Sequence, residues 1–267
     1  MVKHTYEIEV MAKNGTRQKV TLRRFKKDDA PRLYKSWSNP QNYRFNEIPR
    51  AVVCLPDGTV ITGIESIAQM ADYSWPSEYG QYYFVIEDSL TKELIGNVRI
   101  GCDYGDKDVW GFGYNLVRQD DKSEYTMDDI NLAFMPDGVT KDANWGRGYA
   151  TAIVKFIINL AREQNIKKVI SGADILNFGS IKPMLKNGME YVGVDDDIDP
   201  TCEIDLTKPT TIPTEEELDK IWKEYLQDIE EIQQKYKSKL AENTQKHYQK
   251  AVKIWQEGQW YKNQKGK

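Results

Sequence analysis

The stretch NWGRGYATAIVKF, residues 144–156, places two glycines two positions apart directly before a predicted helix. Apolar residues recur after the glycines at the spacing of one helix face, among them Ile153, Val154 and Ile157. Glycine is the poorest helix former after proline, so its use at a helix start needs an explanation. The pattern fits either a glycine-rich turn into a core helix or the close approach of a negatively charged group to the backbone.

Phosphate binding would explain both glycines. The first amides of a helix lack acceptors within it and carry a partial positive charge, so phosphates bind there readily. Gly146 and Gly148 would let a pyrophosphate approach without meeting a Cβ atom, and Arg147 adds a cation. Two common nucleotide motifs are excluded, because the Walker sequence is absent and Thr151 stands where a dinucleotide fingerprint needs its third glycine.

The segments on either side predict a mixed α/β fold. Residues 5–24 alternate polar and apolar around Asn14–Gly15, which predicts a β-hairpin. A strand–helix–strand–helix–strand order over residues 128–206 indicates some parallel pairing. It stays open whether residues 109–118 or 128–135 form the strand that leads into the glycine segment. Further elements are expected as helices at 26–40, 64–73 and 177–188 and as strands at 51–55, 82–88, 94–104, 167–174, 189–194 and 202–206.

The composition changes at TKPTTIP, residues 207–213, which reads as a linker. Thr214 and Glu217 then form the pattern of a capping box, and apolar residues follow three or four apart as far as Leu240. This helical extension either packs back on the domain, folds as a helical hairpin that breaks near residues 241–245, or mediates self-association. We therefore expect a domain over residues 1–206, a linker at 207–213 and a C-terminal amphipathic helical extension over 214–267.

The whole-chain totals exclude several classes of protein. A net charge of −4 and a pI of about 5.5 argue against nucleic-acid binding. No run of eighteen apolar residues and no signal peptide is present, and three scattered cysteines form neither a disulfide framework nor a zinc motif. We therefore expect a cytoplasmic protein of bacterial type with no membrane partner. Only His4 and His247 are present, which excludes a serine–histidine–acid triad and a multi-histidine metal site.

Several motifs in order make the glycine segment more specific. The loop W-G-R-G-Y-A-T opens the long helix, Asn177 and Ser180 then form N-x-x-S at the start of the next helix, and Lys186, Gly188 and Met189 form K-x-G-M at its end. This series resembles the core of the GNAT superfamily of acetyl-CoA-dependent N-acetyltransferases. It is most similar to the branch that acetylates the N-termini of ribosomal proteins and related amines. The resemblance covers about residues 18–206.

The resemblance implies a central, mostly antiparallel mixed sheet that splays between two parallel strands and is flanked by helices. Acetyl-CoA, the implied co-substrate, would lie in the split, with its pyrophosphate on the amides of the glycine loop and with Asn177 and Ser180 beside its pantetheine or phosphoadenosine. No metal is implied. The cofactor-binding residues so implied in the glycine loop are Trp145, Gly146, Arg147, Gly148, Tyr149, Ala150 and Thr151.

Two positions depart from the pattern of the family. Ala143 stands three residues before the first glycine, where the family often has glutamine or arginine. Met184 stands seven residues after Asn177, where many members place a tyrosine that protonates the CoA thiolate. The ribosomal-type branch often lacks that tyrosine, so the substitution does not imply inactivity, but it leaves the proton donor unassigned.

The reaction so implied is direct attack of an amine on the thioester, with a base removing the proton of the amine. Glu87 and Asp174 are the candidate bases, and Tyr114 lies where the family's strand faces the acetyl group. Each also has a plain structural interpretation, as a residue at a strand end or as a packing aromatic. Asp128 and Asp129 could attract a cationic substrate or simply lie in a solvated turn.

The acceptor is left open as a small amine, an antibiotic or a peptide N-terminus. The inserts at residues 47–81 and 118–129 fall where the family shapes its acceptor pocket, and they contain several aromatic residues. Two alternatives to an enzyme are a non-catalytic acyl-CoA sensor that uses its C-terminal helix for interactions and a structural protein that oligomerises, for example as a homodimer, through that helix. The aromatic residues of the inserts are Tyr73, Trp75, Tyr79 and Tyr125.

Overall fold

The computed structural model describes residues 2–12, 14–43, 52–54, 58–73, 80–103, 105–118, 121–122, 124–135 and 146–265. The chain divides into two units, each assembled from three separate segments. These units are defined by contacts in space and not by consecutive residues, so they do not test the expected domains. The division into residues 1–206, 207–213 and 214–267 therefore stays a prediction. Unit 1 comprises Met1–Arg24, Ser74–Leu116 and Trp145–Lys235, and unit 2 comprises Phe25–Tyr73, Val117–Asn144 and Tyr236–Lys267.

An eight-stranded sheet forms the centre of unit 1. Its strand order is β1-β2-β5-β6-β7-β8-β10-β9, and every neighbouring pair is antiparallel except β7 and β8, which are parallel. This arrangement confirms the expected fold class. The strands are β1 (Thr5–Met11), β2 (Arg17–Arg24), β5 (Gln81–Asp88), β6 (Leu94–Asp103), β7 (Asp106–Leu116), β8 (Lys168–Gly172), β9 (Glu190–Val194) and β10 (Pro200–Asp205).

The two parallel strands are joined over a short distance. The pairing of β7 with β8 begins at Val109 and ends where Gly111 lies opposite Ile170. Beyond that point the hydroxyl of Ser171 donates a hydrogen bond of 2.8 Å to the carbonyl of Phe112, and β7 continues to Leu116 without a partner in β8. The sheet is therefore split between β7 and β8 at the carboxyl ends of both strands, as the resemblance implied.

Two helices lie next to β8 in the sequence. Helix α5 (Tyr149–Glu163) precedes β8, and helix α6 (Phe178–Lys186) follows it. The apolar stripe of α5 is buried in the core, and its Phe156 makes edge-to-face contacts with Tyr6 of β1 and Phe84 of β5, at centroid distances of 4.9 and 6.2 Å. The side-chain amide of Asn187 donates a 3.0 Å hydrogen bond to the carbonyl of Thr151 and so links the end of α6 to the start of α5. Gly188 follows with φ of 78°, as a helix C-terminus favours.

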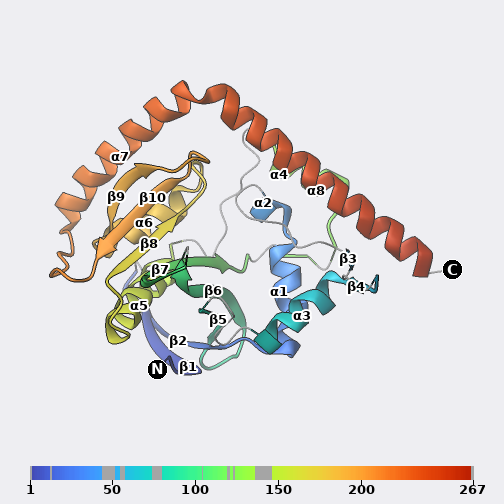
Figure 1. The fold of residues 1–267 in the computed structure, drawn as a ribbon, viewed down its shortest axis with the longest axis horizontal. Helices are drawn as coiled ribbons and strands as arrows, with labels where there is room; N and C mark the ends of the chain where they lie inside the picture. The colour runs from blue at the N-terminus through green and yellow to red at the C-terminus, as the bar shows by residue number, and fades with distance from the viewer. Residues whose placement is uncertain are drawn as a thin grey trace. The chain divides into compact units, whose positions relative to one another are not determined.

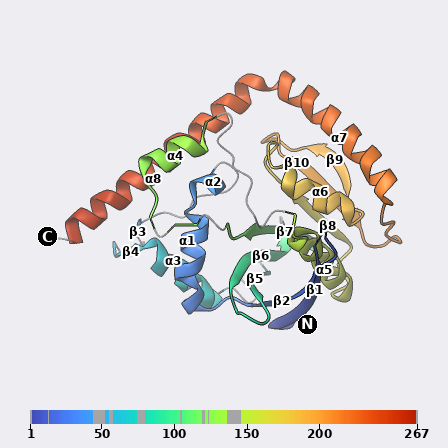
Figure 2. The ribbon, with the colours of Figure 1, turned by 180° about the vertical axis from the view of Figure 1, so that it is seen from behind.

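Helix α7 (Glu215–Lys235) packs on unit 1 beside β9 and α6 (Figures 1 and 2). Its predicted capping box is confirmed, because the carboxylate of Glu217 accepts from the amide of Thr214 at 2.8 Å and the hydroxyl of Thr214 accepts in return at 3.2 Å. Trp222 stacks on Tyr225, and both rings meet Phe178 at the first position of α6 edge to face. The residues of α7 that are buried are Leu218, Tyr225 and Ile229.

Unit 2 is mostly helical. Ile130 packs with Ala251 and Ile254 in a small apolar core. The indole of Trp255 donates a hydrogen bond of 3.1 Å to the carbonyl of Tyr125. No helix of the described residues is long and apolar enough to cross a membrane. The elements of unit 2 are η1 (Lys27–Asp29), α1 (Ala30–Trp37), α2 (Pro40–Tyr43), β3 (Val52–Cys54), β4 (Val60–Thr62), α3 (Gly63–Tyr73), α4 (Met127–Ala133) and α8 (Lys237–Lys265).

The structure decides two points that the sequence leaves open. Residues 127–133 form the helix α4 and not a strand, so only 106–116 is the strand; the hydroxyl of Thr126 accepts from the amide of Asp129 and caps α4. The long C-terminal helix breaks at Tyr236 and not at residues 241–245. The break lies between the buried side chains of α7, which belong to unit 1, and those of α8, which belong to unit 2.

Candidate functional site

The first turn of α5, directly after the glycine loop, presents backbone amides that have no acceptor within the helix. Gly146 and Gly148 have φ of 81° and 86°, and Gly148 is the N-cap of the helix. The amide of Ala152 makes the first helical bond, to the carbonyl of Gly148 at 3.0 Å. The amides of residues 149–151 precede it and have no acceptor within the helix. Together with the helix dipole, they favour an anion at this point.

The two glycines are needed for different reasons. A Cβ atom on Gly148 would lie 2.2 Å from the carbonyl oxygen of Met11, so packing of α5 against β1 requires glycine there. A Cβ atom on Gly146 would meet nothing within 4 Å. Only Gly146 therefore faces open space that a ligand could enter, and the phosphate explanation applies to this glycine alone.

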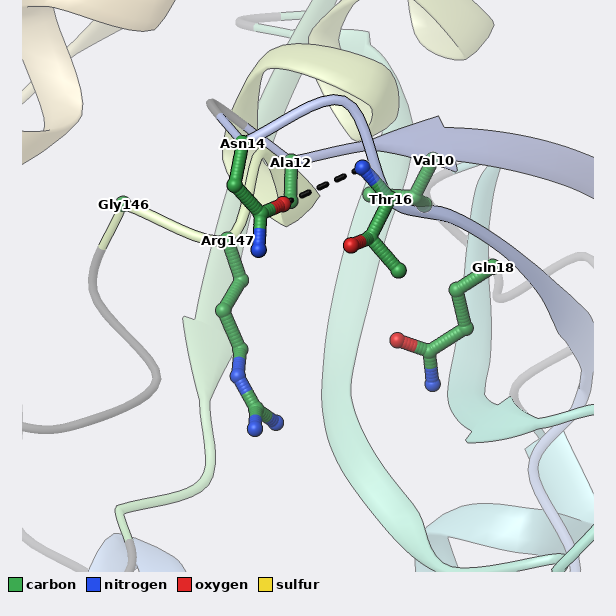
Figure 3. Close-up of a pocket in the computed structure, with 7 residues that line it drawn as sticks. All are labelled: Val10, Ala12, Asn14, Thr16, Gln18, Gly146 and Arg147. Atoms are coloured by element: carbon green, nitrogen blue, oxygen red, sulfur yellow. Dashed lines mark hydrogen bonds between the residues drawn. The ribbon is translucent and has the colours of Figure 1, made fainter.

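A pocket of about 510 Å³ opens beside the loop (Figure 3). The β1–β2 hairpin forms one wall, where the side chain of Asn14 accepts a 3.1 Å hydrogen bond from the amide of Thr16. The sequence predicts the hairpin itself, but no signal in it indicates that the hairpin lies against the loop 130 residues further on. The lining residues are Val10, Ala12, Asn14, Thr16, Gln18, Gly146 and Arg147.

Tyr149 fixes the start of α5 to the hairpin. Its side chain is buried, and its hydroxyl donates a 2.6 Å hydrogen bond to Gln18, whose amide donates to Asp88 at 2.5 Å. Hydrogen bonds to Asp88, chiefly from the amide of Thr91, lower the pKa of this carboxyl group. The side chain of Tyr149 is thus used for packing, and its backbone amide is the part that faces the candidate site.

Three of the expected site residues lie at the split: Asn177 and Ser180 at the start of α6, and Tyr114 in β7. Asn177 is the N-cap of α6, but its side chain makes no capping hydrogen bond. Ser180 lies in the first turn of α6, near Tyr114 of β7. Burial raises the pKa of Tyr114 to about 12, and the neighbouring hydroxyl of Ser180 lowers it in part.

Glu87 lies near the carboxyl end of β5, and its carboxylate is held in an ion pair. Nε and Nη2 of Arg23 both lie 2.9 Å from one oxygen of the Glu87 carboxylate, and Nζ of Lys92 lies 3.9 Å from the other. The side chains of Arg23 and Glu87 are 17 and 9% exposed, so the pair is largely shielded from water. This geometry indicates that Glu87 stabilises the sheet.

Asp174 lies two residues after the end of β8 and has an acidic neighbour that no sequence pattern predicts. Its carboxylate accepts from the amide of Leu176 at 2.8 Å. Burial, followed by the charge of Asp174 and other carboxylates of the β9–β10 turn, raises the pKa of Asp199 to about 7. The acidic run at residues 195–199 is visible in the sequence, but its approach to Asp174 depends on the pairing of β8 with β10.

Other expected residues lie elsewhere. Met184 is buried in α6. Asp129 accepts from the amide of Thr126 in the capping box of α4, and its carboxylate pairs with Lys122 at 2.6 Å. No group of three or more potential metal ligands occurs among the residues that the structure describes. Some residues with an expected role lie outside the part of the chain that the structure describes, or have side chains outside it. They are Tyr73, Trp75, Tyr79, Ala143 and Trp145.

The glycine loop, the split sheet and the start of α6 agree with a known family. Residues 19–190 match the acetyltransferase (GNAT) domain family. The match covers more than half of the chain, so the protein belongs to this family, and the prediction of an acetyltransferase is confirmed. No curated protein is similar enough in sequence to count as a match.

Solved structures with the same fold include two acetyltransferases bound to coenzyme A species. Mycobacterium smegmatis RimJ in complex with CoA-disulfide is 14% identical, with a TM-score of 0.50 over 76% of this chain and 88% of that chain. The aminoglycoside acetyltransferase AAC(6')-Ib in complex with paromomycin and acetyl-CoA is 15% identical, with a TM-score of 0.50 over 70% of this chain and 94% of that chain. At these identities the likeness shows the fold.

Proposed function

We propose that the protein transfers an acetyl group from acetyl-CoA to a primary amine. The observation that carries this proposal is the start of α5, where Gly146 has a positive φ, faces open space and lies beside a pocket that Arg147 also lines. The amides of the first turn and Arg147 would hold the pyrophosphate, and Asn177 and Ser180 would lie beside the rest of the cofactor. A reducing, cytoplasmic location is also proposed, which Cys54, Cys102 and Cys202 support because they form no disulfide among the described residues.

We assign the role of the base to Asp174 in preference to Glu87. The carboxylate of Glu87 is held by Arg23, whereas Asp174 lies just beyond the carboxyl end of β8, the strand that borders the split. The carboxylate of Asp174, with Asp199 only partly ionised near neutral pH, places negative charge there, which would attract an ammonium group before it loses its proton. Asp174→Asn should therefore lower kcat and leave the affinity for acetyl-CoA unchanged.

The acceptor is an amine of cationic character. Within the family we propose an enzyme close to the ribosomal-protein N-terminal acetyltransferases, with a peptide N-terminus, a small amine or an antibiotic as acceptor. AAC(6')-Ib, which shares the fold and was solved with paromomycin and acetyl-CoA, makes aminoglycosides the first acceptors to screen, followed by peptide N-termini and small amines. Binding of acetyl-CoA with no transfer to any of them would favour a non-catalytic sensor instead. Self-association through the C-terminal helix remains a proposal, tested by the mass in solution.

Thermal unfolding with acetyl-CoA, CoA and NAD tests the cofactor. A ligand that binds only the folded protein stabilises it by about 2.7 kcal/mol at 100 times its dissociation constant. We expect acetyl-CoA and CoA to raise Tm and NAD to leave it unchanged. An equal response to NAD, or none to any of the three, would contradict the proposal.

Gly146→Asp tests the position of the phosphate. Aspartate tolerates the left-handed backbone, but its carboxylate would fill the open space and repel a pyrophosphate. Gly105→Asp is the matched control, because Gly105 has φ of 78° and a Cβ atom on it would also meet nothing within 4 Å, but it lies in the β6–β7 turn. Acetyl-CoA affinity should fall at least tenfold in the first variant only, about 1.4 kcal/mol. Equal affinity in both would show that the phosphate binds elsewhere.

A further inference from the structure

The hydroxyl of Tyr114 is a buried polar group without a hydrogen-bond partner among the residues that the structure describes. The ring of Tyr114 is partly exposed and stacks on Phe112 at a centroid distance of 6.4 Å, while its hydroxyl oxygen is shielded from solvent and makes no hydrogen bond in the described structure. Ser180 lies close by but does not meet the geometry of a hydrogen bond. A buried tyrosine hydroxyl usually finds a partner, because leaving one unpaired costs stability.

The position of Tyr114 suggests what the missing partner is. Tyr114 lies three residues beyond Gly111, the last residue of β7 that pairs with β8, so it is in the split part of the sheet. It lies opposite Val98, which lies opposite Phe84, and Phe84 packs on α5. Paired residues of antiparallel strands share a face, so Tyr114 points to the face that α5 covers, where the proposed phosphate site also lies.

We propose, on the basis of the proposed function, that the Tyr114 hydroxyl donates a hydrogen bond to the sulfur of the bound thioester. The arm that joins the phosphates to the sulfur would enter along the face of α5 and α6, which is the side from which Tyr114 projects. The thioester carbonyl would instead meet the backbone amides at the unpaired edge of β7, which lie in the plane of the sheet.

The hydroxyl stabilises charge and keeps its own proton. When the amine attacks the thioester carbon, the new C–N bond forms, the C–S bond breaks, and the sulfur leaves as a thiolate. The proton lost by the amine passes through the base to solvent, and the thiolate takes one proton from water. Because burial holds the pKa of Tyr114 at about 12, well above the value of about 8.5 for an ordinary thiol, Tyr114 donates a hydrogen bond and is not itself deprotonated.

Binding of CoA and of desulfo-CoA, which lacks the sulfur, tests this contact in the full-length protein. At a pH where bound CoA is a thiolate, Tyr114→Phe should weaken CoA by about 10- to 100-fold, the range for a hydrogen bond to a charged group. Its affinity for desulfo-CoA should not change. The ultraviolet absorbance of the thiolate gives a second measurement, because the pKa of the bound CoA thiol should be higher in the variant.

Tyr225→Phe is the matched control. Tyr225 of α7 also carries a buried hydroxyl without a partner among the described residues, but it lies in the aromatic contacts of α7. Both variants should fold with an unchanged or higher Tm without ligand, because neither loses a hydrogen bond. Only Tyr114→Phe should change CoA binding.

The outcomes separate this inference from the proposed function. Equal loss of CoA and desulfo-CoA in Tyr114→Phe, or no loss of either, would overturn the contact with sulfur while acetyl transfer stands. Failure of the unchanged protein to bind CoA would overturn the proposed function and this inference with it.

Discussion

Glu87 shows that the role of a single carboxylate depends on its partners. Its place at the end of a core strand suits a catalytic base, but Arg23 binds its carboxylate through two nitrogens at 2.9 Å. Arg23 and Glu87 lie on the adjacent strands β2 and β5, so the ion pair joins them. The residue type in the sequence is the same for either role, and only the fold brings Arg23 to it.

Glu87→Gln should reduce stability more than catalysis. Breaking a buried ion pair leaves the other charge uncompensated, which costs about 3 kcal/mol. Chemical denaturation should show this loss, while kcat per folded molecule stays near that of the unchanged protein. Glu93→Gln, at an exposed position in the β5–β6 turn, should change stability by less than about 0.5 kcal/mol. A large fall in kcat with an unchanged free energy of unfolding would instead indicate that Glu87 is the catalytic base.

Asp199 makes stability depend on pH. Burial raises its pKa from 3.8 to about 7, so between these values the folded state binds more protons than the unfolded state. The free energy of unfolding therefore falls as pH rises through this window. Asp199→Asn removes this loss, so the Tm of the variant relative to the unchanged protein should be higher at pH 7.5 than at pH 4. A difference that does not vary with pH would contradict the assigned cause.

At the scale of elements, α7 is part of unit 1 and not a free appendage. Its aromatic residues meet Phe178 at the first position of α6, and the hydroxyl of Tyr191 in β9 donates a 2.6 Å hydrogen bond to Asp228. Nζ of Lys182 also lies 5.0 Å from the centre of the Trp222 ring. Helix α7 thus supports the helix start that carries Asn177 and Ser180.

Trp222→Ala should therefore destabilise unit 1 by about 3 kcal/mol, because it removes a large packed ring and its cation–π contact. Leu226→Ala is the control on the exposed side of α7, with an expected loss below about 1 kcal/mol. Both losses are measured by chemical denaturation. Equal losses would show that the aromatic contacts contribute nothing beyond helix formation.

The sequence predicts elements with strong periodicity and misses what depends on distant partners. The hairpin, α5, α6 and the capping box of α7 follow from local patterns, and the structure confirms them. Residues 127–133 resemble a strand because their apolar run is short, although Thr126 and Asp129 give a local signal for a helix. The break at Tyr236 has no local signal, because a change of packing partner sets it.

The same limit applies to the candidate site. The glycine segment is recognisable from its residues, but packing of Gly148 on Met11 is not predictable, since the two are far apart in the chain. The pocket wall from the β1–β2 hairpin and the approach of Asp199 to Asp174 also depend on sheet pairing. The roles of Glu87, Tyr114 and Asp174 stay predictions until variants are measured.

At the scale of the whole molecule, ligand effects should be confined to unit 1. Hydrogen exchange of backbone amides reports local opening. Acetyl-CoA should slow exchange in the β1–β2 turn and at the starts of α5 and α6, but not in α8 of unit 2. NAD is the control and should slow none of these segments. Equal protection of α8 would show that binding acts on both units, and an unaffected hairpin would remove its pocket from the site.

The discontinuous make-up of the two units also bears on biosynthesis. Unit 2 draws on residues from 25 to beyond 250, and its small core needs Ile254 of α8 against Ile130 of α4. A ribosome that has made α4 has still to make all of α5 to α7 before that partner exists. During that interval the apolar side of α4 lacks its packing partner and stays exposed. The nascent chain is therefore a candidate for chaperone binding.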